Sequence, residues 1–265
     1  MKSAVKQLLG GTIFASRLDA LLLRRSAVIV AFHRVHEAAG GDDSLSVSVE
    51  MFERHCRFLQ RHFRVVRLAD IVEKLERGQG FDRELAITFD DGYRDNFEKA
   101  APVLERLGLP ATFFVVTEWM GTSVVPWWDG ERGARHPWMS WDEVRTLHRK
   151  GFDIGAHTRT HADLGAVSGS EAAEELFGAR RDLEKELGAP ADLFAYPYGG
   201  RHQMSEANRE LVKAAGFRCC CACVGGINGA GASPFDLQRV PISSWHRSPQ
   251  QFGFEVATGR TSLTA

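Results

Sequence analysis

The chain has 265 residues, which is enough for one large domain with a substantial core. Hydrophobic residues make up 44% and charged residues 25% of it, the proportions of an ordinary globular protein. The formal net charge of -1 gives no electrostatic reason to expect a nucleic-acid ligand. No apolar stretch reaches the length of a transmembrane helix.

The N-terminal part, residues 1–27, is expected to form a helical extension ahead of a single domain over residues 28–265. Residues 8–15 follow two lysines, but this apolar run is weak and broken by glycines, which is poor for a signal peptide. The leucines and arginines of residues 21–25 favour a helix that packs on the domain or on a membrane surface. We therefore expect a cytoplasmic protein, with export as the alternative.

Strands and helices are predicted to alternate along the rest of the chain. We predict strands over residues 28–32, 85–89, 111–116, 151–156, 193–196, 217–223 and 240–243. We predict helices over residues 50–59, 68–76, 95–107, 140–150, 168–187, 205–215 and 249–257. This alternation implies an α/β fold with a parallel sheet, either open or closed into a barrel.

Two adjacent carboxylates follow the second of these strands. The strand is apolar on both faces, and Asp90 and Asp91 come at its C-terminal end, where α/β folds place their chemistry. Neighbouring side chains of an extended segment point in opposite directions, so one carboxylate could bind a metal while the other acts as a base. The alternative is an Asp-Asp-Gly turn of no function, with Gly92 allowing the sharp bend.

Two histidines, His157 and His161, follow the fourth predicted strand. Together with a distant aspartate they make a plausible three-ligand site that leaves positions for water and substrate. Two histidines and one carboxylate are also the ligand set of non-haem iron oxygenases. The second carboxylate, Asp90, favours hydrolysis, because a hydrolytic water needs a base. The alternative is a histidine pair on the surface or in the core.

These motifs resemble those of the polysaccharide deacetylase family, the NodB-homology domain of carbohydrate esterase family 4. The three matching segments are residues 88–91, 157–161 and 194–199, and the resemblance extends over roughly residues 28–245. It implies an irregular (β/α) barrel of about seven parallel strands, less regular than the eight-stranded kind.

The resemblance also implies roles for single residues. It makes Asp90 the general base, and it makes Asp91, His157 and His161 the ligands of a divalent metal, usually Zn2+. It further suggests that the backbone N–H of Tyr198 helps to hold the oxyanion of the transition state.

The chain departs from the family pattern at two places. The third motif usually contains an arginine that braces the base, but this chain has Ala195; Arg239 is a candidate substitute, and a surface arginine is the alternative. The C-terminal Leu-x-His motif, which supplies a general acid, is absent. His33 ends the first strand and resembles that motif moved to the front, as in the circularly permuted poly-N-acetylglucosamine deacetylases. His33 is thus the general-acid candidate, His246 its rival, and a histidine of no function the alternative.

Tryptophans and cysteines leave further alternatives open. Residues 124–130 and 137–138 form a tryptophan-rich insert that would either stack on sugar rings or simply cover the barrel mouth. Four of the five cysteines crowd one predicted strand within residues 219–223, where successive side chains face opposite sides, so we expect small buried thiols in a reducing compartment.

The sequence as a whole predicts a metal-dependent hydrolase that removes acetyl groups from N-acetylated amino sugars of a polysaccharide or oligosaccharide. The expected partner is this carbohydrate, with neither nucleic acid nor a transmembrane span, and the oligomeric state is open. One alternative is a hydrolase of another amide, such as a cyclic ureide. The other is a non-catalytic carbohydrate-binding protein, for which the missing arginine would be the signature.

Overall fold

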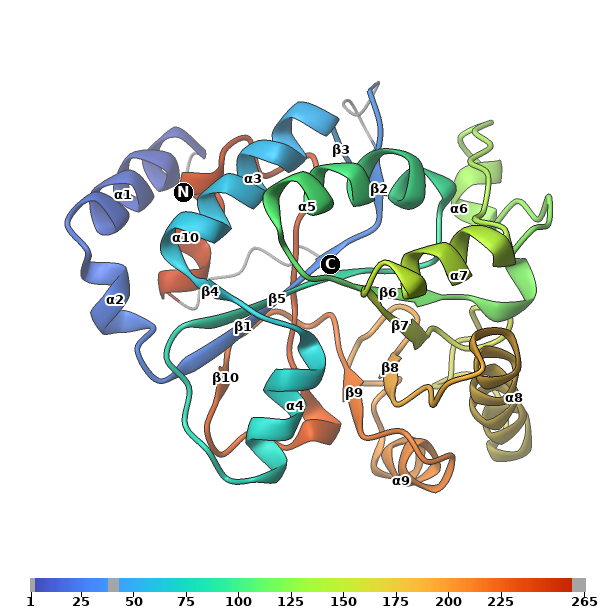
Figure 1. Cartoon of the computed structure of the whole chain (residues 1–265). Helices are drawn as coiled ribbons and strands as arrows, with labels where there is room; N and C mark the ends of the chain where they lie inside the picture. The colour runs from blue at the N-terminus through green and yellow to red at the C-terminus, as the bar shows by residue number, and fades with distance from the viewer. Residues whose placement is uncertain (1–2, 38–42, 259–265) are drawn as a thin grey trace.

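A curled sheet of mostly parallel strands runs through the middle of the molecule, with helices packed around it (Figure 1). The computed structural model describes residues 3–37 and 43–258. The strands of the main sheet are β1 (Ser26–Phe32), β4 (Arg64–Val65), β5 (Glu84–Phe89), β6 (Thr112–Val115), β7 (Asp153–Ala156), β8 (Leu193–Ala195), β9 (Cys219–Cys221), β10 (Asn228–Gly229) and β11 (Val240–Pro241). A separate pair is formed by β2 (Arg34–Val35) and β3 (Ser46–Val47).

The sheet curls so far that residues 237–241 pair both with β9, at one end of the sheet, and with β1, next to the other end. Its strand order is β10-β1-β5-β6-β7-β8-β9, and β11 lies parallel beside β1 while β4 lies beside β5. Cys221 of β9 forms a bridge with Leu237, and Val240 of β11 pairs with Val30 of β1. The predicted irregular α/β barrel is therefore confirmed, with β10 as an antiparallel exception.

The strands at the centre of the sheet are buried on both faces, as their apolar sequences predict. Every residue of β5, and all but the first of β1, is buried. In β1, Val28 and Val30 belong to one core cluster and Ile29 to another, because successive side chains point to opposite faces. The predicted strands over 217–223 and 240–243 are shorter in the structure, where loop backbone flanks the paired residues.

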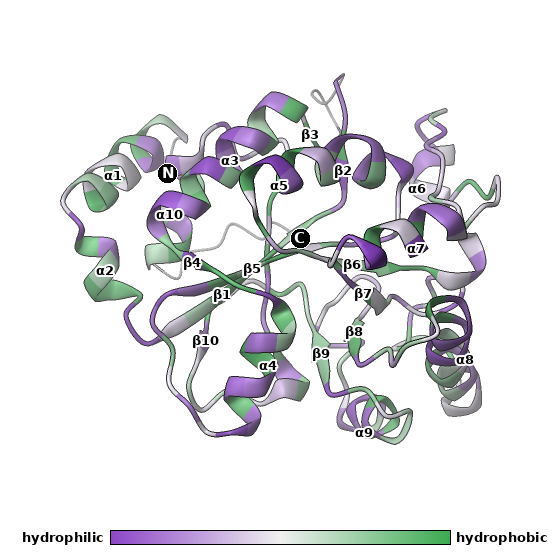
Figure 2. Cartoon of the chain, in the orientation of Figure 1, coloured by the Kyte–Doolittle hydropathy of each residue, from purple (hydrophilic) through white to green (hydrophobic). Residues whose placement is uncertain are grey.

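Helices surround this sheet, and hydrophobic and hydrophilic residues alternate along most of them (Figure 2). They are α1 (Ser3–Ala15), α2 (Leu18–Leu22), α3 (Val49–His62), α4 (Leu68–Glu76), α5 (Ala101–Leu107), α6 (Trp127–Gly130), α7 (Trp141–Arg149), α8 (Gly169–Leu187), α9 (Glu206–Ala214) and α10 (Pro249–Thr258). A π-helical segment, Asn96–Ala100, leads into α5. The predicted capping box at Ser140 and Glu143 is present and starts α7.

The N-terminal helix α1 lies against the C-terminal helix α10. The inner face of α1 packs on α10, and Phe14 of α1 makes an edge-to-face contact with Phe58 of α3 at 4.8 Å between ring centroids. The helix α2 then leads into β1. Among the described residues, no helix combines the length and apolarity that crossing a membrane requires.

Candidate active site

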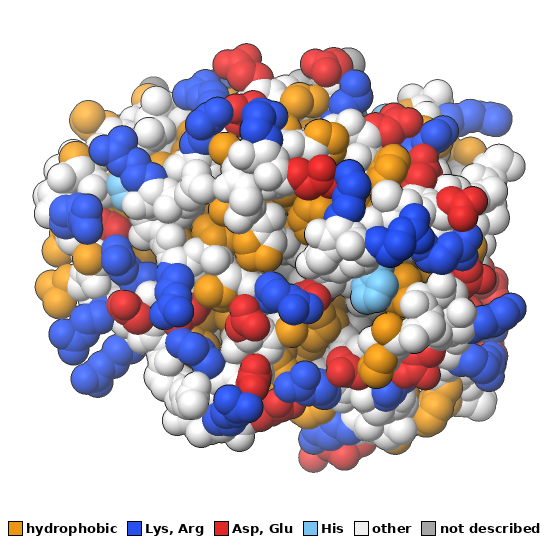
Figure 3. Space-filling view, in the orientation of Figure 1, with side chains coloured by type: hydrophobic (Ala, Val, Ile, Leu, Met, Phe, Trp, Pro, Cys, Tyr) orange, Lys and Arg blue, Asp and Glu red, His pale blue; other side chains and the backbone are white. Residues whose placement is uncertain are grey.

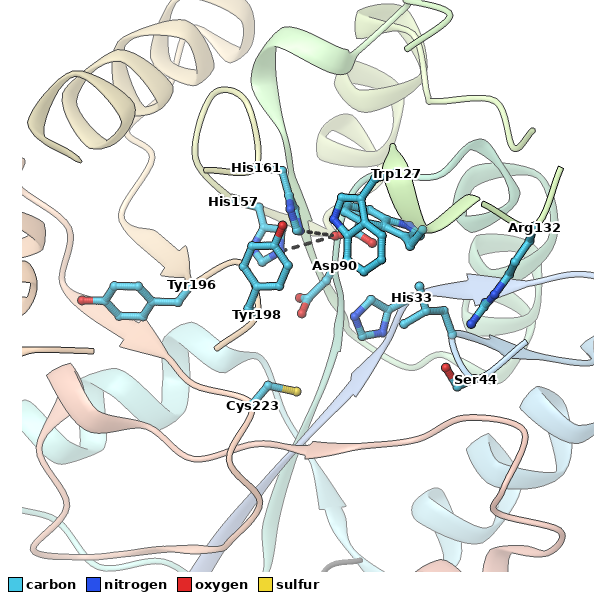
Figure 4. A pocket seen from close by; sticks show the side chains of 13 residues that line it. His33, Ser44, Asp90, Trp127, Arg132, His157, His161, Tyr196, Tyr198 and Cys223 are labelled. Atoms are coloured by element: carbon cyan, nitrogen blue, oxygen red, sulfur yellow. Dashed lines mark ion pairs between the residues drawn. The ribbon is translucent and has the colours of Figure 1, made fainter. Parts of the chain in front are cut away.

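Six of the residues that the sequence marked out line one cavity of about 330 Å³ at the C-terminal ends of the strands. They are His33, Asp90, Asp91, His157, His161 and Tyr198. Three of these residues directly follow the ends of three different strands: His33 follows β1, Asp90 follows β5 and His157 follows β7. In the view of Figure 4, His33 lies on the other side of Asp90 from the histidine pair.

Asp91, His157 and His161 converge at one point. The Nε2 atoms of His157 and His161 lie 3.4 and 3.3 Å from Oδ1 of Asp91, and the nearest ligand atoms of the three side chains are all within 4.8 Å of one another. This Oδ1 atom is buried and has no hydrogen-bond partner among the described residues.

A divalent metal, which the family pattern implies, fits this group. Ligands bound tetrahedrally at about 2.0–2.2 Å lie about 3.3–3.6 Å apart, which matches the separations of the two histidine nitrogens from Asp91. Two imidazoles and one carboxylate are a donor set that suits zinc, and they leave room for water and substrate. The Oδ1 atom of Asp91 also supports a metal here, because a buried carboxylate oxygen normally has a partner and this one has none among the described residues.

The ring of His157 is fixed in the orientation that ligation requires. Its Nδ1 lies 2.8 Å from the carbonyl oxygen of Ala195, so Nδ1 carries a hydrogen and donates a hydrogen bond to that carbonyl. The Nε2 atom faces Asp91 and is the nitrogen that would bind a metal. Ala195 stands at the position where the third family motif usually has an arginine, and here its backbone carbonyl contacts His157.

Several site residues occupy left-handed backbone conformations that residues other than glycine rarely adopt. The φ angles are 73° at Asp91 and 61° at His161 and at Tyr198. Gly92 follows with φ of 86°, and a Cβ atom there would lie 2.8 Å from the Met120 side chain. Such strain is concentrated at functional sites, where the surrounding structure enforces it.

Asp90 is held by a buried arginine from a distant part of the chain. The Nη1 and Nη2 atoms of Arg239 each donate to one oxygen of Asp90 at 2.7 Å. Arg239 also donates to the Ala222 carbonyl at 2.8 Å and to Oγ1 of Thr88 at 3.0 Å, and it is fully buried. The brace that Ala195 cannot supply therefore comes from Arg239, just ahead of β11.

Charges around the two aspartates keep both ionised. Burial acts to raise the pKa of Asp90, but the opposing effect of the Arg239 guanidinium, with His157, lowers it below its usual value. Burial likewise acts to raise the pKa of Asp91, and the imidazoles of His157 and His161 hold it well below the usual range. Both carboxylates can therefore accept protons or bind a cation at neutral pH.

The structure separates the two general-acid candidates. His33 lines the cavity and lies near enough to Asp90 and Asp91 to lower the pKa of each. His246 is buried outside the cavity, where its Nε2 lies 3.2 Å from Oε2 of Glu255. Of the two candidates, only His33 therefore lines the cavity.

Tyr198 is another residue that lines the cavity. Its ring is about half exposed and stands edge-on to the ring of His161, with 5.0 Å between centroids. Its backbone N–H donates to no other backbone group of the described chain.

The tryptophans in and near the insert divide into buried rings and an exposed one. Trp138 is buried and stacks on Tyr93 at 4.4 Å, while Trp119 stacks on His161 at 5.4 Å, so these rings cover and support the site. Trp127 is 60% exposed and lines the cavity, which suits it to stack on a sugar ring.

A buried charged network, which the sequence did not suggest, anchors this insert. Arg34 forms ion pairs with Asp129 at 2.5 Å and with Asp43 at 2.6 Å. The hydroxyl of Tyr93 donates to Asp129 at 3.1 Å and accepts from the indole N–H of Trp128 at 3.0 Å. Arg34 directly follows His33, but nothing in the sequence pairs it with an aspartate 95 residues away. Only the fold brings them together.

Two further cavity-lining residues also escaped sequence reasoning. Arg132 follows α6 in the insert, and Cys223 follows β9. Arg132 carried no motif, and Cys223 was interpreted with its neighbours as a core thiol. Burial raises the pKa of the Cys223 thiol to about 11, so it is not a nucleophile at neutral pH.

Comparisons with known proteins agree with this geometry. The family model described as polysaccharide deacetylase matches residues 77–220. The Bacillus subtilis (strain 168) protein YxkH is 24% identical over 213 residues, which cover 78% of this chain and 69% of that protein. The poly-beta-1,6-N-acetyl-D-glucosamine N-deacetylase of Staphylococcus aureus (strain MRSA252) is 24% identical over 215 residues, 73% of this chain and 70% of that enzyme.

A solved structure shows the same fold. IcaB from Ammonifex degensii superposes with a TM-score of 0.72 at 22% identity, covering 89% of this chain and 97% of that one. The family model spans more than half of the chain, and its match includes the Asp90-Asp91 and His157–His161 motifs that the structure brings together. This chain therefore belongs to the polysaccharide deacetylase family.

Proposed function

We propose that the protein is a metal-dependent hydrolase that removes acetyl groups from N-acetylated amino sugars of a polysaccharide or oligosaccharide. The observation that carries the proposal is the arginine-braced Asp90 beside the convergent Asp91, His157 and His161 in one cavity. A base and a ligand set in such proximity serve hydrolysis. The exposed Trp127 at the cavity wall adds an apolar platform of the kind that sugar rings stack on.

In this proposal Asp91, His157 and His161 hold the metal. The metal would supply a water of lowered pKa and polarise the acetyl carbonyl. Asp90 accepts a proton from the attacking water, and Arg239 keeps this carboxylate ionised and oriented. A carbon–oxygen bond forms at the acetyl carbon, and the N–H of Tyr198 donates to the oxygen that gains negative charge.

His33 completes the reaction as the general acid. The amine is a poor leaving group until it is protonated, so protonated His33 donates to the nitrogen as the carbon–nitrogen bond breaks. The products are acetate and the free amino sugar. The position of His33, opposite the histidine pair and close to Asp90, supports its role as the general acid.

The alternative of a non-catalytic carbohydrate-binding protein loses its main argument. That reading depended on the missing motif arginine, and Arg239 makes the contact that the arginine would make. A hydrolase of another amide remains a distinct candidate, and the substrate assay below separates it. A cytoplasmic location stays a prediction, which the free thiols of all five cysteines fit.

Acetate release from N-acetylglucosamine oligomers tests the proposal. Oligomers with β-1,6 and with β-1,4 linkages should be compared after chelation and after adding back zinc, with the bound metal measured in parallel. We expect acetate from at least one oligomer, loss of activity on chelation and its return with metal. A protein that binds metal but releases acetate from neither oligomer would refute the substrate class.

A further inference from the structure

The helices α1 and α2 leave an apolar surface uncovered at one end of the molecule. Leu8 is 72% exposed and Leu21 is 68% exposed, and they are the most exposed large hydrophobic side chains of the described chain. Four more large hydrophobic side chains of these helices are exposed by at least 40%: Val5, Leu9, Leu18 and Leu22. Monomeric soluble proteins rarely show such a group without a partner for it.

The outer face of α1 cannot turn inward, because its inner face is already docked. A Cβ atom at Gly10 would lie 1.9 Å from the carbonyl oxygen of Gln250, so the α1 backbone sits directly on α10. Beside it, Lys6 pairs with Glu255 at 2.7 Å. A helix that is apolar on both faces is normally buried on both, and here the protein covers only one of them.

Unpaired positive charges surround the exposed leucines. Arg17, Arg24 and Arg25 are exposed and form no ion pair with any described residue. The one acidic residue of these helices, Asp19, is buried and faces Arg83 at 3.6 Å. Figure 3 shows hydrophobic and basic side chains next to one another along the left edge, over α1 and α2.

We propose that this α1–α2 surface docks the protein on a membrane that contains anionic phospholipid, without spanning it. Apolar side chains that enter the interface, with arginines at the depth of the headgroups, are the combination that holds interfacial helices. A net negative protein would not approach such a membrane through its average charge, so the local excess of arginine is what selects this face.

Docking in this way leaves the cavity accessible. The helix α2 ends at Leu22 and leads into the N-terminal end of β1, whereas His33 follows the other end of that strand. Seven strand residues separate the two ends, a distance of about 23 Å at 3.3 Å per residue. The cavity therefore lies at the opposite end of β1 from α2, so docking through α1 and α2 does not cover the residues that line it.

Vesicle flotation with the full chain tests the proposal. We expect binding to vesicles of phosphatidylcholine with phosphatidylglycerol, weaker binding to phosphatidylcholine alone, and release by salt. Arg24→Glu/Arg25→Glu should weaken binding to anionic vesicles by at least about 25-fold, since each arginine contributes about fivefold. Leu8→Glu/Leu21→Glu should weaken it at least about tenfold.

Matched variants elsewhere on the surface control for charge and polarity. Arg149→Glu/Lys185→Glu changes the net charge equally, and Phe177→Glu places a charge on another exposed hydrophobic site; both should bind like the wild type. Acetate release from a soluble oligomer should be the same in every variant, so failure of docking and failure of the proposed function remain distinguishable.

Two results would overturn the docking proposal. The first is no preference of the wild type for anionic vesicles, or an equal loss of binding in the control variants. The second is a wild-type dimer in sedimentation velocity that Leu8→Glu/Leu21→Glu dissociates, without vesicle binding by either protein. That outcome would assign the surface to a second copy of this chain.

Discussion

Replacing Arg239 by methionine should leave a buried carboxylate without its counter-charge. Arg239 and Asp90 share two hydrogen bonds of 2.7 Å, and both side chains are almost fully buried. Breaking one side of such a pair costs about 3–5 kcal/mol, a large part of the 5–15 kcal/mol that stabilises an average domain. We expect Arg239→Met to lose about that much free energy of unfolding, measured by urea denaturation of the metal-free protein.

A double-mutant cycle separates this cause from general damage to the core. Arg239→Met/Asp90→Asn removes both charges, so it should recover most of the stability that Arg239→Met loses. Arg218 and Glu76 provide the matched control, because they form a similar two-bond pair at the exposed surface. Arg218→Met should cost less than about 1 kcal/mol. Additive losses in the double variant would refute the reasoning that Arg239 holds the charge of Asp90.

Four further predictions follow from the site and from the N-terminal contact. Asp91→Asn should lower metal affinity far more than Asp90→Asn, whereas Asp90→Asn should abolish turnover; equal loss of metal in both would contradict the roles, as measured by metal titration. His33→Ala should lower hydrolysis of an N-acetyl amide by about 10²–10⁴-fold but spare an activated acetyl ester, whose phenolate leaves without a proton; equal losses on both substrates would exclude a general acid. Trp127→Ala should raise KM for oligosaccharides several-fold with kcat nearly unchanged, unless the ring has no contact with sugar. Burial acts to raise the pKa of Glu255, but the His246 and Lys6 side chains lower it to about 2; its stabilising contribution is therefore complete above pH 4.5 and lost as the pH falls toward 2, so hydrogen exchange in α1 should rise over that range, and Glu255→Gln should remove this dependence.

The order of strands and helices could be predicted from the sequence because it depends on local patterns. The apolar run before Asp90 is a strand covered on both faces, and the capping box at Ser140 starts a helix where its residues predict one. The positions of Asp90, Asp91 and His157 after their strands followed from the same patterns. These features need only neighbouring residues, so a reader of the sequence has all the information that fixes them.

The partners of these residues depended on contacts between distant parts of the chain. Arg239 lies 149 residues from Asp90 in sequence, and Arg34 lies 95 residues from Asp129; no local pattern pairs either of them. The sequence also left His33 and His246 as rivals, because a histidine near a strand end looks the same in both cases. Only the curled sheet shows that His33 lines the cavity and that His246 does not.

What the sequence by itself determined is the chemistry at the strand ends: two carboxylates, two histidines and the strands that carry them. What only the tertiary structure decided is which charges compensate them and which surfaces stay uncovered. The physical reason is that a buried ion pair such as Asp90 with Arg239 is selected by proximity in space. The exposure of Leu8 likewise depends on which face of α1 the helix α10 has already covered.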